Sequence, residues 1–563
     1  MKWLLGFVFL SLGAQVYAQQ EFIQSSEWRI TKSTWTEQDE RNFGEFVARL
    51  GAAVERRECE MVDTCLRSGA NPYAGTDPSG LRLYADCADL PYYLRSYFAW
   101  KNGLPMSVVS SISPRNVPGN SGDIRYTPFG NYVTSRFDIL ARNSAGRGRF
   151  WDSFWNDILK TKYPNAVSLL NGTITDVTYS ATFRMMGVED GVLFTDFYPV
   201  KLDRDGIRPG TVIYDPNGHV AIIYKVTDDG HIFYIDAHPD NTLTSGMYNQ
   251  KFERSNPYQG AGFKNFRPIA VVNAKQDSNG AYVGGKIVAA KNNQLRSYSL
   301  EQFYGNNPDP GGVWQKGQFL YNGNPMPYYD YLRIKMASGT LRIDPILDMR
   351  QNVADICGSL KDRVVAVATA LKSGVQNKEH PLRLPLNIYG ADGEWENYAS
   401  PARDARLKVS YMELVSQSRD LIQRYKVGDP TIVYSGKNLA QDLLKTYQSE
   451  ARACQFSYVN TSGRPVTLDL DQARQRLFDM SFDPYHCAEL RWGGTSPQEI
   501  ASCPDNENKK AWYSQERWLR YQYERRYDAR MDFSLEELNG PKPGAGIAAP
   551  PNVDIVKFLS SQQ

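Results

Sequence analysis

Histidine is scarce in this chain of 563 residues, with five copies in all. None of the five stands in an H-x-x-x-H spacing, and the seven cysteines include no C-x-x-C pair. Those short spacings are the usual signature of a metal site. Their absence predicts that the protein has no metal site and needs no cofactor.

An excess of positive charge is also missing. Lys and Arg number 64 against 62 Asp and Glu, for a formal net charge of +2. Proteins that bind phosphate backbones need a clear basic excess. The balance therefore argues against nucleic acid as the main partner, and it leaves the oligomeric state open.

Long apolar runs are confined to the N-terminus. Lys2 precedes an apolar stretch at residues 3–13, and Val-Tyr-Ala at 16–18 has the small-residue pattern of a cleavage site. The stretch is shorter than the ~20 apolar residues that cross a bilayer, although a buried N-terminal helix is an alternative. Residues 1–18 are therefore predicted to be a signal peptide. It would send the protein to the periplasm or outside the cell, with no stable membrane anchor.

The seven cysteines are an odd number. Cysteines outside the cytosol tend to pair, so one should remain as a free thiol. Cys59 is close in sequence to Cys65 and Cys487 to Cys503, while Cys357 and Cys454 both fall in the C-terminal half. Pairing these six leaves Cys87 free, although six cysteines can pair in many other ways.

Composition divides the mature chain into regions. Residues 19–275 mix short helices with strand-turn-strand signals, and residues 276–293 are rich in Asn, Gly, Lys and Ala, which is typical of a linker. Residues 294–535 are predicted to be mostly helical, and residues 536–563 have the Gly- and Pro-rich composition of a flexible tail. The helical prediction depends on apolar residues at a spacing of three to four in the segments 364–371, 411–425, 439–453 and 512–530.

Cys87 lies just before a predicted helix. Apolar residues recur on one face from Leu90 to Phe98, and Asp86 or Asp89 can cap the helix start. Free backbone N–H groups and the helix dipole lower the pKa of a thiol at this position, and a thiolate is the nucleophile of cysteine catalysis. The alternative is a buried structural cysteine or one half of a disulfide.

Three of the five histidines fall in one predicted hairpin. Asp215 to Gly218 is a strong turn signal before a strand at 219–226, and Asp229 with Gly230 is a preferred two-residue loop before a strand at 231–237. With that loop, Asp228 would pair with His231.

Side chains alternate between the two faces of a strand. In the predicted register His219, Asp236 and His238 share one face, and His231 lies on the other as a surface residue. A shift of one residue would reverse this arrangement, so the Asp-Gly loop carries the inference.

These segments together resemble the NlpC-type cell-wall peptidases and, more distantly, the CHAP amidases of the papain-like group. The shared pattern is Asp-Cys-small-x-Leu at the start of a helix, here residues 86–90, and Gly-His-Val-[Ala/Gly]-Ile on a later strand, here residues 218–222. A third polar residue follows on the next strand, where this chain has Asp236. Residues 72–80 are similar to the lead-in that precedes the family's cysteine.

The chain also departs from the family. Cys87 and His219 are 132 residues apart, more than a compact core has, so an insertion is expected at about residues 107–199. Pro91 interrupts the first turns of the helix. The third residue is usually His, Asn or Gln, and His238 is the rival of Asp236 for that position.

The resemblance implies an α+β fold, in which the helix that carries the cysteine packs against an antiparallel sheet, followed by a mostly helical C-terminal domain of unknown role. It also implies acyl transfer, in which His219 takes the proton of Cys87 and Asp236 orients the imidazole. The Cys87 backbone N–H, with possible support from Tyr73, would bind the oxyanion. The family's usual substrate is the peptide part of peptidoglycan.

Two other readings remain open. The order Cys, His, Asp on neighbouring strands is also that of transglutaminases, which join an amine to the acyl group. Alternatively, the protein is a non-catalytic secreted protein that binds glycans or another protein, with Trp492, Trp512 and Trp518 stacking on sugars.

Overall fold

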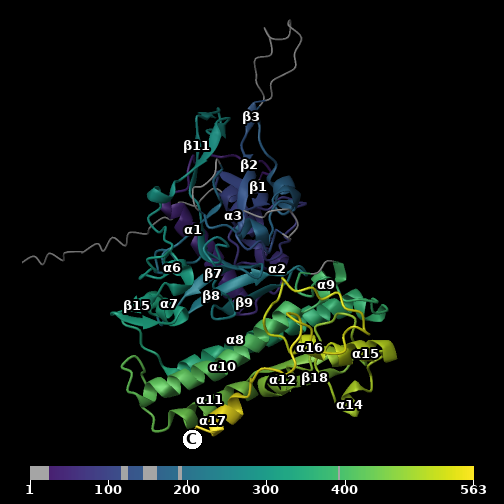
Figure 1. The fold of residues 1–563 in the computed structure, drawn as a ribbon. Helices are drawn as coiled ribbons and strands as arrows, with labels where there is room; N and C mark the ends of the chain where they lie inside the picture. The colour runs from purple at the N-terminus through teal and green to yellow at the C-terminus, as the bar shows by residue number, and fades with distance from the viewer. Residues whose placement is uncertain (1–24, 116–123, 144–160, 188–192, 391–392, 563) are drawn as a thin grey trace, which may run out of the picture.

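The computed structural model describes residues 25–115, 124–143, 161–187, 193–390 and 393–562. The predicted signal peptide, residues 1–18, lies outside these ranges. Figure 1 shows two parts, a half built around a β-sheet and a layer of long helices beneath it. No helix among the described residues is long and apolar enough to span a bilayer.

The first half is built on a six-stranded sheet in which every pairing is antiparallel. The two strands of the predicted histidine hairpin lie near its middle. From one edge to the other the strands are β5 (Phe197–Pro199), β10 (Gly262–Phe266), β6 (Val212–Asp215), β7 (His219–Val226), β8 (Ile232–Ala237) and β9 (Leu243–Met247).

Two helices, α1 (Glu37–Glu55) and α3 (Asp89–Lys101), cover one face of this sheet and share its main hydrophobic core. Thr36 caps α1 through a capping box with Asp39, which satisfies the free N–H groups of the first turn. Helix α3 is buried along its whole length, and its buried cations Arg95 and Lys101 form ion pairs with Glu40 and Asp77. The helix predicted after Cys87 is therefore present.

The opposite face of the sheet is covered too. Ile213, Ala221 and Ile223 pack there in a second core with α7 (Tyr328–Met336) and β15 (Phe319–Tyr321), which pairs with β16 (Asn324–Met326). A strand that is buried on both faces reads as a continuous apolar run. This explains why the sequence from Val220 to Tyr224 shows no polar alternation.

The segment predicted as a linker forms strands. β11 (Ile269–Val272) pairs with β14 (Lys286–Ala289), and between them β12 (Lys275–Gln276) pairs with β13 (Tyr282–Val283). Gly284 and Gly285 have φ angles of 73° and 78°, which suit the turn that joins β13 to β14. The Gly- and Asn-rich composition of residues 276–293 therefore reflects tight turns and not an unstructured connection.

The expected insertion at 107–199 contains a long hairpin of β1 (Met106–Pro114) and β2 (Asn131–Ile139). Its other described elements are short: β3 (Arg142–Asn143), β4 (Thr161–Lys162), α4 (Ala166–Ser168), the turn of π-helix at Leu169–Thr173 and α5 (Ser180–Phe183). Its last three residues, in β5, join the edge of the main sheet.

The C-terminal half is organised by α8 (Pro345–Ser373), α10 (Pro401–Lys426) and α11 (Leu439–Ala453), which share a third core. Asp344 caps the start of α8, and Gly374 ends it in the left-handed region with φ 80°. Figure 1 shows α8 and α10 side by side beneath the sheet. The helical segments predicted at 364–371, 411–425 and 439–453 lie within these three helices.

Further short elements occur in both halves. They are α2 of the first half (Val62–Leu66) and, in the C-terminal half, α9 (Gly393–Tyr398), β17 (Gln455–Val459), β18 (Pro465–Asp469), α12 (Leu470–Arg476), α13 (Ala488–Arg491) and α14 (Pro497–Ile500). The helix predicted at 512–530 is instead α15 (Glu507–Gln515) and α16 (Arg517–Arg520), and no helix continues from 521 to 530. In this non-helical segment, Arg525 forms a buried ion pair with Asp215 of the sheet.

The predicted flexible tail is packed against the molecule. Ile555 and Leu559 of α17 (Ile555–Ser560) are fully buried in the core of α8, α10 and α11. Leu538 and Ala545 are buried in a separate small core. The tail composition is that of turns between anchored apolar residues, so the prediction of flexibility was wrong.

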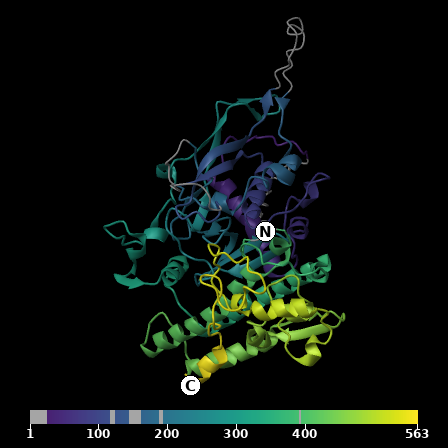
Figure 2. The ribbon, with the colours of Figure 1, turned by 45° about the vertical axis from the view of Figure 1, so that its right-hand side comes forward.

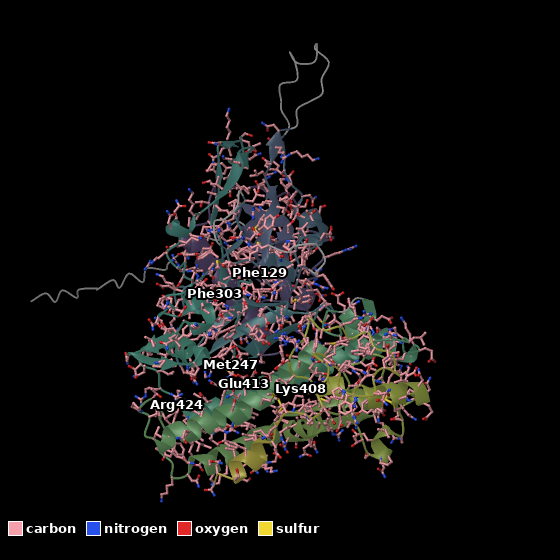
Figure 3. The ribbon with its side chains drawn as sticks, in the orientation of Figure 1. Phe129, Met247, Phe303, Lys408, Glu413 and Arg424 are labelled. Carbon is pink, nitrogen blue, oxygen red and sulfur yellow. A yellow bond between two sulfur atoms is a disulfide. The ribbon has the colours of Figure 1, made fainter. Side chains whose placement is uncertain are left out.

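Buried polar contacts join the two halves. Asp355 of α8 accepts hydrogen bonds from the Met247 backbone N–H and from Lys251 Nζ, each at 2.7 Å. The carboxylate of Glu413 in α10 accepts one from the Gln250 N–H at 3.0 Å. Met247 and Glu413 are labelled on the two sides of this contact in Figure 3. Figure 2 shows the yellow C-terminal segments rising from the helical layer toward the sheet.

The three predicted disulfides are present. They join Cys59 to Cys65, Cys357 to Cys454, and Cys487 to Cys503. Cys87 is the free cysteine of the described chain, as predicted.

Candidate active site

A tight turn positions His219. The Gly218 N–H donates to the Asp215 carbonyl at 3.0 Å, and the Asn217 N–H donates to the Asp215 carboxylate at 2.9 Å. Gly218 has a φ of 80°, which a residue with a side chain adopts at a cost. The predicted turn therefore forms, and it ends with His219 as the first residue of β7.

The next turn differs from the prediction. The Thr227 N–H donates to the His231 carbonyl, so the loop is longer than Asp229 and Gly230 alone. Lys225 pairs with Phe233 beyond it, and the register shifts again between Lys225 and Ile223. The two shifts add up to two residues, which restores the predicted face because side chains alternate with a period of two. His219, Asp236 and His238 consequently keep the common face that was predicted.

Asp236 is the direct partner of His219. The Nε2 of His219 lies 2.6 Å from Oδ2 of Asp236, and both side chains are buried. The other oxygen of Asp236 accepts a hydrogen bond from the Thr244 hydroxyl. His238 is more distant: its Nε2 lies 3.8 Å from Oδ2 of Asp236 and 3.2 Å from the Thr244 hydroxyl. This arrangement leaves Nδ1 of His219 as the ring nitrogen available for proton transfer.

Cys87 lies at the start of α3. Asp86 caps the helix, because its carboxylate accepts hydrogen bonds from the N–H groups of Ala88 and Asp89 at 2.9 Å each. Pro91 is the third residue of the helix, where its missing N–H costs nothing. Within the part of the chain that the structure describes, the Cys87 N–H forms no hydrogen bond, so it is available to an oxyanion.

Cys87 and His219 line one cavity of about 230 Å³, and His238 lines it too. Asp236 lies behind His219 and is not part of the wall. Tyr73 is not brought there: it packs among aromatic rings of the first core, and its hydroxyl accepts a hydrogen bond from Asn102.

Segments far from the motifs close the cavity. The insertion contributes Tyr126 and Tyr179, and the C-terminal half contributes most of the remaining wall. The residues from the C-terminal half that face the site include Tyr389, Trp395, Arg403, Arg406 and Tyr527. No local pattern in the sequence signals these residues, since each contacts the site across hundreds of positions of the chain.

Burial is the largest influence on the pKa values of Cys87 and His219. Burial, and next the charge of Asp86, raises the pKa of the Cys87 thiol, while the Val220 N–H opposes this rise. Burial, followed by the charge of Arg406, lowers the pKa of His219 to about 4. The thiol and the imidazole that line the cavity are therefore both neutral at neutral pH.

The carboxylate behind His219 behaves differently. Burial alone would raise the pKa of Asp236, but His238, His219 and Arg406 outweigh that effect and hold the pKa below its usual value. Asp236 is consequently ionised at neutral pH. An ionised carboxylate on Nε2 stabilises the imidazolium that forms when His219 accepts a proton.

No protein-family profile, curated protein or solved structure matches this chain.

Proposed function

We propose that this protein is an exported cysteine hydrolase, a peptidase or amidase that acts by acyl transfer through a thioester. One observation carries the proposal: the free Cys87 and His219 line the same cavity, and His219 is held by the buried, ionised Asp236. A nucleophile, a base and a group that orients the base are the parts that this chemistry requires.

The reaction follows from these positions. His219 accepts the thiol proton at Nδ1 as the Cys87 sulfur attacks the carbonyl carbon, and the oxyanion is bound by the Cys87 N–H. The tetrahedral intermediate collapses to a thioester, and the imidazolium gives its proton to the departing amine. Water, deprotonated by His219, then attacks the thioester and releases the carboxylic acid with the free thiol.

The proposed substrate is the peptide part of peptidoglycan. Its support is the resemblance of residues 86–90 and 218–222 to the NlpC-type pattern, together with three disulfides, which persist in oxidising compartments outside the cytosol. An exported protein of a walled cell meets this polymer.

The glycan-binding alternative loses two of its three candidate indoles, whereas Trp518 is half-buried. The side chains of Trp492 and Trp512 are buried in the cores of the C-terminal half, with 0% and 2% of their surface exposed. Buried indoles cannot stack on a sugar.

The test is digestion of purified peptidoglycan peptides by the mature protein, followed by mass spectrometry for new amino termini. Cys87→Ala should abolish cleavage. Ser180→Ala is the matched control, because it removes a small polar group from the wall of the same cavity and should retain activity. Undiminished cleavage by Cys87→Ala would refute the proposal. Ammonia release that requires an added amine acceptor would instead assign a transglutaminase.

A further inference from the structure

The two histidines outside the hairpin lie together in the C-terminal half. His380 and His486 surround a point that Asp483 and Glu516 also face, and the side chains of all four are 0% exposed. Aromatic rings enclose the group: Trp512 stacks on His380, and Tyr513 lies edge-on to His486. The cluster is thus a buried polar centre with aromatic rings against both histidines.

The four side chains approach one another at distances typical of metal ligands. Asp483 Oδ2 lies 3.0 Å from His380 Nε2 and 3.2 Å from His486 Nε2, and Glu516 Oε2 lies 3.7 Å from His486 Nε2. Ligand atoms of His380, Asp483 and Glu516 all lie within 4.8 Å of one another. Ligands bound at about 2.1 Å to a tetrahedral zinc ion stand about 3.4 Å apart.

The atoms that converge on this point form no hydrogen bonds within the described chain. They are His380 Nε2, His486 Nε2, Asp483 Oδ2 and both carboxylate oxygens of Glu516. Buried polar atoms are nearly always hydrogen-bonded, and a buried carboxylate with neither oxygen bonded is costly. A cation between His380, Asp483 and Glu516 would satisfy these three groups, and His486 Nε2 adjoins both carboxylates.

The outward atoms of the same residues are held in place. His380 Nδ1 lies 2.6 Å from the Pro381 carbonyl, and His486 Nδ1 lies 2.9 Å from an Asp505 carboxylate oxygen. A carbonyl or carboxylate can only accept, so each Nδ1 carries a proton and each ring directs its Nε2 inward. Metal-bound histidines are oriented by such contacts. The outer oxygen of Asp483 is likewise bonded to the Tyr485 N–H at 2.8 Å.

We propose that His380, Asp483, His486 and Glu516 bind one zinc ion or a chemically similar first-row divalent ion. Two imidazoles and two carboxylates suit such ions, and four protein ligands leave no open position, which is the pattern of a structural site. The ion would join the segments around residues 380, 483–486 and 516. The prediction of no metal site missed this cluster, because His380 and His486 stand 106 residues apart and form no short ligand spacing.

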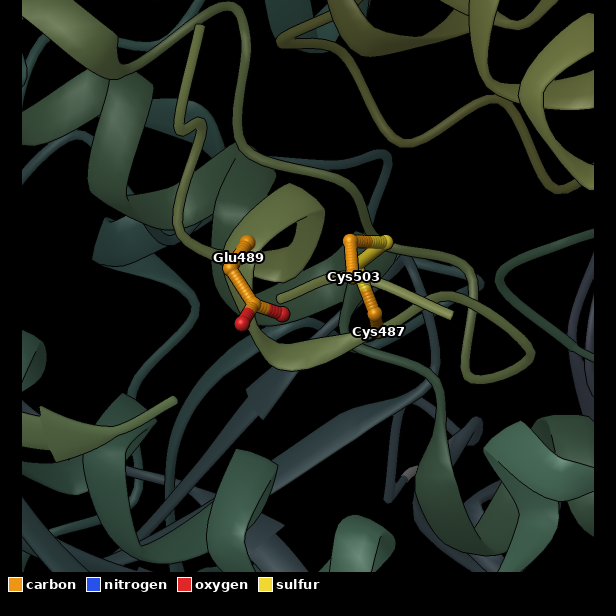
Figure 4. A group of neighbouring side chains, drawn as sticks. All are labelled: Cys487, Glu489 and Cys503. Carbon is orange, nitrogen blue, oxygen red and sulfur yellow. A yellow bond between two sulfur atoms is a disulfide. The ribbon is translucent and has the colours of Figure 1, made fainter. Parts of the chain in front are cut away.

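Two other groups of possible ligands serve as a contrast. Figure 4 shows Glu489 beside Cys487 and Cys503, whose sulfurs are bonded to each other and are not free for a metal. The second group is Asp229, His231 and Asp348, in which Arg333 already pairs with Asp348 through two hydrogen bonds. Neither group contains a buried polar atom that lacks a hydrogen-bond partner, as the two carboxylate oxygens of Glu516 do.

The test measures metal in the full mature protein, purified, stripped with a chelator, incubated with zinc chloride and desalted. Elemental mass spectrometry should find about one zinc per chain, and zinc should raise the Tm of the stripped protein. Glu516→Gln, which keeps the shape of the side chain, should reduce the zinc content at least about tenfold. Asp348→Asn is the matched control and should retain the ion, as should Cys87→Ala.

Wild-type protein without zinc and with an unchanged Tm would overturn the proposal. Loss of zinc in Asp348→Asn or in Cys87→Ala, with retention in Glu516→Gln, would place the ion elsewhere and overturn it too. Should Glu516→Gln fail to fold, anomalous diffraction from zinc-loaded wild-type crystals decides the question, because the ion must lie within about 2.3 Å of the four side chains. An active site that proves inactive leaves this result unaffected.

Discussion

The ion pair between Arg525 and Asp215 should be essential for docking the C-terminal segment onto the sheet. The two groups are 2.5 Å apart, and their side chains are only 4% and 1% exposed. The Arg525 guanidinium also donates to the Lys251 carbonyl at 2.9 Å. The pair thus joins the turn before His219 to the segment that ends at Tyr527, in the wall of the cavity.

Arg525→Met removes the cation and keeps most of the length of the side chain. The Asp215 carboxylate is then left buried with the Asn217 N–H as its remaining hydrogen-bond donor. Breaking a buried pair by removing one partner costs about 3–5 kcal/mol, since the uncompensated charge stays out of water. In the double variant with Asp215→Asn the charge is gone, so the loss of stability should be clearly smaller than the sum of the two single losses.

The assay is chemical denaturation of all four proteins of the cycle, paired with the rate at which iodoacetamide alkylates Cys87 in the folded protein. Arg525→Met should also speed alkylation, because it loosens the Tyr527 wall and hydrates a thiol whose pKa is raised by burial. A loss of stability below about 1 kcal/mol, or purely additive losses in the cycle, would refute the reasoning.

Three further predictions concern the site and its support. Asp236→Asn should lower kcat/KM by about four orders of magnitude, whereas His238→Asn should lower it less than about tenfold; equal losses would contradict the assigned roles. Burial raises the pKa of Glu413 from 4.5 to about 8, so the folded state binds an extra proton between those values and stability falls as the pH rises across them. In Glu413→Gln the urea denaturation midpoint should no longer fall as the pH rises across this range. The same pH dependence in the variant and the wild type would contradict the prediction. Replacing Cys357 and Cys454 by Ser should cost about 4 kcal/mol, because their bond closes a loop of 97 residues; a midpoint that does not move would argue against this.

Interactions between residues that are close in sequence made part of the site predictable. The turn from Asp215 to Gly218 and the cap at Asp86 were correct, because each depends on residues that are neighbours in sequence. The hairpin loop was wrong in length, and the strand shift near Tyr224 was not foreseen. The common face of His219 and Asp236 was still predicted correctly, since two one-residue shifts restore the alternation.

Composition predicted the structure of the linker and tail segments less well. Residues 276–293 are rich in Gly and Asn and residues 536–563 in Gly and Pro, yet they contribute strands and buried anchors such as Ile555. The wall residues Tyr389 and Tyr527 could not be predicted, because their place depends on how the two halves dock. The same holds for the cluster of His380 and His486, whose members come together only in the folded core.

The cavity is completed by residues that are synthesised after Cys87, His219 and Asp236. The proposed nucleophile, base and orienting carboxylate are all present once Asp236 has been synthesised, whereas Tyr389, Arg406 and Tyr527 follow much later in the chain. A growing or truncated chain would therefore contain Cys87, His219 and Asp236 without the C-terminal residues that cover the cavity. The Cys87 thiol is enclosed only when the full chain has been synthesised and folded. Removal of the C-terminal half by a protease would expose the thiol again.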